Sequence, residues 1–337
     1  MRGSELQKYC SVSDSGGMRS LMAVSLTRKS HLRGLDLMRL SNFSAWTLFS
    51  MLCALAVALN WRTLAATFSL ALQREEFTHI LLIFPLSLAL ISMEWKSPRK
   101  GLNRGWVSGM LLLVVAAGIF IFARLASIAL DLQRSLGMFA FVTSCIGVFV
   151  LCFGGDVSRN SVFPLCFLYW AVPLPPAALA RVTQFLQHGS AIGAYSLFTV
   201  AGIPVAQDKL LLTIPGLTVE VARECSSIRS SMMLLVTTMF LGQLLLNSAL
   251  HKTLLTLIAI PLSVAKNSLR IFTIAMLGTK VDPAFLTGKL HRQGGGLFFA
   301  IALLLVLLVL YVFRRRERRL QDISAAPALA GTTLSFS

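Results

Sequence analysis

The sequence predicts an all-α, polytopic membrane protein with about eight transmembrane helices, and composition, hydropathy and long apolar runs lead to this class. Of the 337 residues, 55% are hydrophobic and only 13% are charged, whereas about 25% are charged in a soluble domain. The mean hydropathy is +0.74. These values exclude a disordered or collagen-like chain. A net charge of +17 would suit nucleic acid, but that partner needs a basic patch on a soluble fold, so we expect none.

Eight apolar segments are long enough to cross a bilayer, which takes about 20 residues. The last segment has no charge from Gly295 to Phe313. The fifth segment contains four prolines, so we expect a kink or an early end near Pro173. The predicted spans are residues 43–60, 77–94, 106–123, 136–153, 162–181, 226–247, 253–277 and 295–313.

Lysine and arginine residues are distributed unevenly between the connecting segments. If the N-terminus is cytoplasmic, the inner segments hold 18 of them and the outer segments 10, with three more inside spans. Because positive charge concentrates in cytoplasmic loops, both termini are predicted to be cytoplasmic. We expect residues 1–42 to form a disordered tail and residues 43–313 the membrane domain. A basic tail is expected over 314–337, disordered from Gln321.

The longest outer segment covers residues 182–224, which we expect to be an extracytoplasmic loop. Its first part is weakly apolar and suits the membrane interface. Two β-prone runs in its second part flank Pro215 and Gly216. This pattern predicts a β-hairpin that ends just before Cys225.

Cys225 differs from the other cysteines because polar residues surround it. The six cysteines include no CxxC pair, so we expect neither a metal site nor a disulfide framework. Cys225 opens the sixth span, where the partial positive charge of a helix N-terminus favours a thiolate. Arg229 follows one helical turn later and would stabilise that thiolate. The alternative is a snorkelling arginine beside an incidental cysteine.

The seventh span carries three polar residues, Lys266, Asn267 and Arg270. A charge in the membrane centre costs roughly 2.5–3.5 kcal/mol on insertion scales. Two charges in one helix therefore indicate a polar cavity or a protein-buried site, and we favour this over simple packing through backbone carbonyls. Asn267 shares a helix face with Arg270, whereas Lys266 receives no role beyond packing or a cavity.

Two histidines lie at predicted outer ends of spans. His291 precedes three consecutive glycines before the eighth span, and His79 opens the second span. Either histidine alone is more often interfacial than catalytic. However, Cys225, Arg270 and His291 come from three different spans and all fall on the outer side. Together they would supply a nucleophile, a cation for the oxyanion and a general base.

The combined motifs resemble the exosortase/archaeosortase family, whose members are multi-spanning sorting enzymes of the cysteine transpeptidase type. The resemblance covers roughly residues 44–313, and a histidine in the third catalytic position is similar to the bacterial branch. Ser227 stands where the family commonly has glycine. The matching motifs are Glu224 to Ser230, Pro261 through Asn267 to Arg270, and His291 with its glycines.

The resemblance implies a cysteine peptidase or transpeptidase that needs no metal or cofactor, in the bacterial inner membrane with its active site outside. The implied substrates are secreted proteins with a C-terminal signal of three parts: a Pro-Glu-Pro motif, a hydrophobic helix and a basic tail. The substrate would lie in the membrane lipid with its motif at the outer face. An unknown amine acceptor or water would take the acyl group. The implied roles are nucleophile for Cys225, general base and acid for His291, oxyanion stabiliser for Arg270, and support for Arg229, Asn267 and His79.

A different function remains an alternative. A transporter or an exopolysaccharide-export component would use the polar residues of the seventh span as a substrate path. It would tolerate Cys225→Ser and form no covalent intermediate. The absence of an evident inverted repeat makes this function less favoured.

Overall fold

The structure is a computed structural model that describes residues 45–94, 106–221, 228–284 and 295–332. Within these ranges, six helices are long and apolar enough to cross a membrane by length and composition, or up to eight if each of two bent pairs is one span. The predicted all-α polytopic class is confirmed. The predicted N-terminal tail, Cys225 and His291 lie outside the described residues.

Two of the predicted spans are bent helix pairs. The helix Ala45–Leu59 meets α2 (Trp61–Gln73) at 75°, so the predicted first loop is helical. The segment Val162–Ala171, which comprises α6 (Val162–Phe167) and η3 (Leu168–Ala171), meets α7 (Pro176–Val200) at 93°. The bend falls at the proline-rich link, where proline rings block a continuous helix. The expected break near Pro173 is therefore confirmed.

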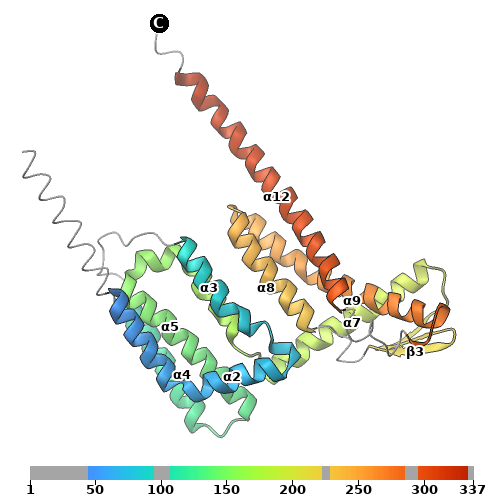
Figure 1. The fold of residues 1–337 in the computed structure, drawn as a ribbon, viewed down its shortest axis with the longest axis horizontal. Helices are drawn as coiled ribbons and strands as arrows, with labels where there is room; N and C mark the ends of the chain where they lie inside the picture. Colours follow the sequence, from blue (N-terminus) through green and yellow to red (C-terminus); the bar gives the residue numbers. More distant parts are fainter. Residues whose placement is uncertain (1–44, 95–105, 222–227, 285–294, 333–337) are drawn as a thin grey trace, which may run out of the picture.

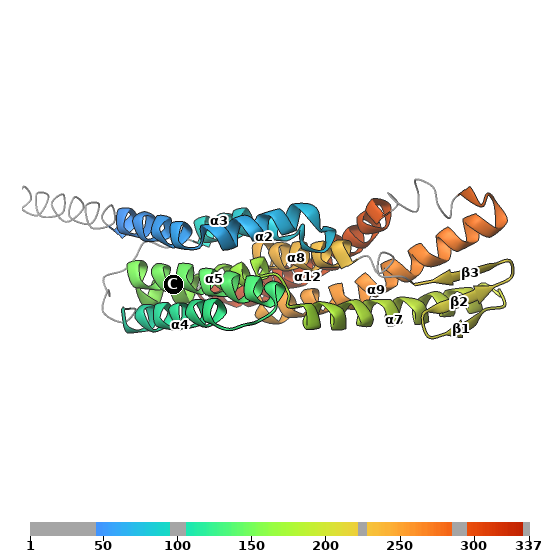
Figure 2. The ribbon, with the colours of Figure 1, turned by 90° about the horizontal axis from the view of Figure 1, so that it is seen from below.

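The first half of the chain packs mainly through apolar side chains and glycines. It contains η1 (Glu75–Phe77), α3 (Ile80–Glu94), α4 (Trp106–Leu125) and α5 (Leu130–Asn160). A Cβ on Gly109 of α4 would lie 2.9 Å from the backbone nitrogen of Leu151, so the two helices touch closely. Figure 2 shows these helices at one end of the molecule and the strands of residues 206–220 at the other end.

Helix α7 overturns the expectation that residues 182–224 form a loop. It runs for 25 residues, with Pro176 in its first turn, where proline favours helix initiation. A Cβ on Gly193 would lie 2.2 Å from Ser268 Oγ in the neighbouring helix α9, and Gly189 also faces that helix. Glycines four residues apart let two helices approach closely. The weak hydropathy of this segment reflects a face buried against protein.

A three-stranded antiparallel sheet follows α7, in the order β1 (Ala206–Asp208), β2 (Leu211–Ile214) and β3 (Leu217–Glu220). The β2–β3 hairpin turns at Gly216, whose φ of +80° suits glycine. The predicted hairpin is confirmed, and β1 is an additional strand. Leu212, paired with Val219, is buried in a core shared with α7 and α9.

Three long helices complete the chain: α8 (Ile228–Leu245), α9 (Ala249–Lys280) and α12 (Gly295–Thr332). A three-residue connection makes α8 and α9 antiparallel, and α12 packs against both before it extends past the other helices (Figure 1). The expectation of disorder from Gln321 is wrong, because α12 continues to Thr332. The part of the helix after Gln321 contains four alanines, the residue with the highest helix propensity.

Candidate active site

The chain that leads to Cys225 is held at its last described residue. The side-chain amide of Gln187 in α7 donates a hydrogen bond to the carbonyl oxygen of Val221, at 2.9 Å. The amide of Val221 donates to the carbonyl oxygen of Leu210, also at 2.9 Å. Gln187 and Val221 are both buried. The backbone is therefore fixed immediately before the segment 222–227.

The chain is held again where α8 begins. Ile228 is buried in a small apolar cluster with Leu186 and Met232, against which Leu174 and Leu179 pack. Ser230, in the first turn of α8, accepts a hydrogen bond from the ammonium group of Lys266. Cys225 thus belongs to a six-residue segment, 222–227, with a fixed position at each end.

Lys266 is a buried cation, with only 5% of its surface exposed. Its hydrogen bond joins α9 to the first turn of α8. Cys225 lies three residues before this helix in the sequence. A buried ammonium group is costly unless it is hydrogen-bonded. The role of Lys266 could not be read from the sequence because its partner, Ser230, lies 36 residues away.

Asn267 joins α9 to α7 on another face. Its side-chain amide donates a hydrogen bond to Ser190 Oγ at 2.9 Å, and only 1% of Asn267 is exposed. Ser268 donates to the carbonyl oxygen of Ser190 at 3.2 Å. The structure therefore places Asn267 in the packing of α7 on α9, where it supports the position of neighbouring groups.

Arg270 lies beyond Lys266 on α9, level with the beginning of α8. The register comes from two hydrogen bonds: Lys252 donates to Gln243 at 2.9 Å near the connecting turn, and Lys266 donates to Ser230 near the other end. Four residues advance a helix by about 6 Å. Because the helices are antiparallel, position 270 of α9 lies past the level of Ser230, near the beginning of α8.

Arg229 and His79 each contact a residue of η1. The guanidinium of Arg229 forms an ion pair with Glu75 Oε1 at 3.6 Å, and half of the arginine side chain is exposed. This pair brings η1 against the start of α8, a contact that the sequence analysis did not predict. His79 is buried, with only 6% of its surface exposed, and its Nδ1 lies 3.1 Å from the carbonyl oxygen of Glu76.

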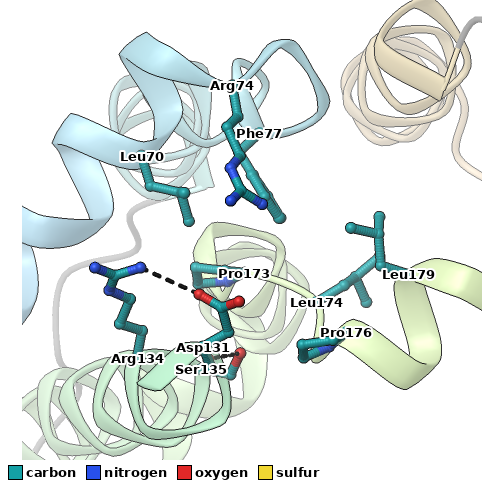
Figure 3. Close-up of a pocket in the computed structure, with 10 residues that line it drawn as sticks. All are labelled: Leu70, Arg74, Phe77, Asp131, Arg134, Ser135, Pro173, Leu174, Pro176 and Leu179. Atoms are coloured by element: carbon teal, nitrogen blue, oxygen red, sulfur yellow. Dashed lines mark hydrogen bonds and ion pairs between the residues drawn. The ribbon is translucent and has the colours of Figure 1, made fainter. Parts of the chain in front are cut away.

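A cavity of about 60 Å³ opens beside this region (Figure 3). Its walls come from the end of α2 and η1, from the beginning of α5, and from the link into α7. Arg74 points into the space between these elements, and Arg134 Nη1 pairs with Asp131 Oδ1 at 3.1 Å. We call this space the Arg74 cavity.

Sequence reasoning found Arg270 and the polar residues of the seventh span, but it missed Gln187, Ser230 and the Arg74 cavity. Their signal was weak because their partners come from distant parts of the chain. A glutamine in the middle of an apolar helix could have drawn attention to Gln187, since a buried amide needs a partner.

Comparison with known proteins supplies the family. A family model of transmembrane exosortases matches residues 71–308, which is most of the chain. Neither the curated proteins nor the solved structures contain a match. The matched region runs from the end of α2 into α12 and includes Arg74, Arg229, Lys266 and Arg270. This chain is a multi-pass membrane protein that belongs to the transmembrane exosortase family of sorting enzymes.

Proposed function

We propose that the protein is a cysteine transpeptidase of the bacterial inner membrane that removes C-terminal sorting signals at the outer face. Its substrates would be secreted proteins that end in a Pro-Glu-Pro motif, one hydrophobic helix and a basic tail. Both termini of the enzyme would be cytoplasmic, in agreement with the lysine and arginine distribution. Family membership supports a membrane sorting enzyme, and the finer substrate and topology are part of the proposal.

The observation that carries the proposal is that buried polar groups hold the chain on both sides of Cys225. Gln187 binds Val221 before it, and Lys266 binds Ser230 after it. Arg270 lies on α9 at the level where α8 begins. Such preorganisation is what a nucleophile requires, since a small misplacement of the reacting atom costs much of the rate.

The proposed reaction divides into acylation and transfer. His291 takes the proton of the Cys225 thiol, and the thiolate attacks the scissile carbonyl carbon. Arg270 stabilises the negative oxygen of the tetrahedral intermediate. When the peptide C–N bond breaks, His291 gives its proton to the leaving amine. An amine acceptor or water then attacks the thioester and releases the thiolate.

Arg229, Asn267 and His79 take supporting roles in this proposal. Arg229 lies one turn after Cys225 in sequence, and its ion pair with Glu75 orients it. Asn267 stabilises the packing of α9 on α7. His79 is buried next to η1, and its supporting role would be to hold that segment in place.

Replacement of the nucleophile tests the proposal. Cys225→Ala should abolish removal of the C-terminal helix from a cognate substrate, measured in proteoliposomes with the purified full-length enzyme. Cys166→Ala is the matched control, because Cys166 is an exposed thiol in α6, and it should leave the rate unchanged. Full processing by Cys225→Ala would contradict the mechanism. Full activity of Cys225→Ser, together with no trapped thioester in the parent enzyme, would favour the transporter alternative.

A further inference from the structure

We propose that the Arg74 cavity binds the acidic side chain of the substrate next to the scissile bond. The inference rests on the proposed function and adds a specificity site to it. The ligand is a carboxylate carried by an extended peptide. Charge, shape and location of the cavity each support this ligand.

The charge of the cavity favours an anion. Its lining contains two guanidinium groups, from Arg74 and Arg134, and one carboxylate, from Asp131. Arg134 is paired with Asp131 at 3.1 Å. Among the residues that the structure describes, no acidic side chain lies within ion-pair distance of Arg74. The cavity thus carries one net positive charge, and Arg74 presents it.

The shape of the cavity suits a small group. A cavity of about 60 Å³ is several times larger than the roughly 10–15 Å³ that one water molecule needs. That space accepts a carboxylate and is too small for a helix or a lipid chain. Phe77, Leu70 and Pro173 form apolar walls. Arg74 itself is exposed, so an ion pair with it would form in contact with water, and the apolar walls would shield it only in part.

The location of the cavity connects it to the candidate active site. Leu174 and Leu179 line the cavity and also pack against the apolar cluster that contains Ile228, the first residue of α8. Glu75, the neighbour of Arg74 in sequence, pairs with Arg229 in the first turn of α8. A peptide whose scissile bond lies at the start of α8 therefore has the cavity within reach of its neighbouring side chains.

A double-mutant cycle tests the contact. The enzyme variant is Arg74→Gln, and the substrate variant replaces the glutamate of the Pro-Glu-Pro motif with glutamine. Both are assayed with full-length enzyme in proteoliposomes. We expect Arg74→Gln to lower kcat/KM about tenfold on the glutamate substrate, a typical loss for a charge-assisted hydrogen bond. On the glutamine substrate it should have almost no further effect. Arg74→Lys should retain part of the activity because the charge remains.

Arg181→Gln is the matched control, because Arg181 is exposed on α7 and is not part of the cavity lining. It should act equally, and weakly, on both substrates. An equal loss for Arg74→Gln on both substrates would overturn the proposal, since Arg74 would then act through folding or lipid headgroups. Cleavage that survives Cys225→Ala would instead contradict the proposed function, so the two failures are distinguishable.

A crosslinking measurement does not depend on turnover. A photoreactive amino acid at Leu70, in the wall of the cavity, is introduced into the Cys225→Ala enzyme. It should crosslink to the glutamate-containing segment of the substrate and lose that product with the glutamine substrate. Crosslinks that are equally strong with both substrates, or that form only with the hydrophobic helix, would contradict the proposal.

Discussion

The α8–α9 pair has buried polar contacts at both of its ends, and the two ends differ in what these contacts hold. At the connecting turn, Glu317 of α12 accepts hydrogen bonds from the backbone amides of Asn247 and Ser248, at 2.9 and 3.0 Å, and lies 2.7 Å from His251 Nδ1. At the other end, Lys266 binds Ser230 in the first turn of α8.

The contacts at the connecting turn stabilise the fold, whereas the contact at the other end positions the start of α8. Glu317 satisfies the free amides at the start of α9 and faces the positive end of the helix dipole, so the turn network is complete within three helices. The other end places two cations of like sign, Lys266 and Arg270, one turn apart, which is unfavourable for a helix. The hydrogen bond of Lys266 holds the first turn of α8, which directly follows the segment 222–227. Buried polar groups at such cost indicate function.

Among the changes that test the two ends of the α8–α9 pair, the largest effect is expected for Lys266→Met. Loss of its hydrogen bond frees the first turn of α8, so cleavage should fall roughly 10- to 100-fold, as expected for a hydrogen bond to a charged group. The rate is measured in proteoliposomes, with thermal unfolding as a check of folding. Lys252→Met is the matched control, because Lys252 binds Gln243 at the opposite end of the same helix pair. An equal loss of cleavage rate in both variants would contradict a special role for the end at Lys266.

A second prediction concerns Gln187→Leu. This change leaves the buried carbonyl of Val221 without its side-chain donor, and we expect the cleavage rate to fall about tenfold. The rate at which a thiol reagent labels Cys225 should change as well, because the segment before it is released. Gln207→Leu is the control, since Gln207 is in the edge strand β1 and its partner is the nearby Lys209 carbonyl. Unchanged labelling in Gln187→Leu would contradict a positioning role.

The smallest effect on activity is expected for Glu317→Gln. The variant keeps the shape but loses the charge at the start of α9, which should cost about 1–2 kcal/mol of stability. The midpoint of thermal unfolding should fall, while cleavage stays within about twofold of the parent. Glu220→Gln, an exposed residue of β3, should change neither quantity. A large loss of cleavage in Glu317→Gln would show that the turn network also serves the site.

Local features of the fold were predictable because their causes are local. The turn between β2 and β3 needs a residue with positive φ, and Gly216 supplies it next to a proline. The break near Pro173 follows from proline geometry. Helix α7 was missed because glycines and polar residues lower its hydropathy, and its packing on α9 depends on contacts such as that between Gly193 and Ser268.

The sequence indicated which residues could form the candidate site, but it did not indicate how they are arranged or paired in space. Cys225, Arg270 and His291 emerged from polar residues at the ends of apolar spans and from motif resemblance, and their grouping in space stays a prediction. Asn267 and Lys266 emerged as costly polar groups in a membrane helix. The partners that hold them, Ser190 and Ser230, are hydroxyl groups with no distinctive sequence pattern.

The sequence by itself determined the membrane class, most of the spans and the hairpin, because a bilayer demands apolar helices that satisfy their own backbone groups. Only the tertiary structure decided which helices meet and which groups pair. Hydropathy is similar on every lipid-compatible helix, so it does not specify partners. Close glycine contacts between α7 and α9, and the hydrogen bonds of Gln187 and Lys266, select one arrangement and place the chain around Cys225.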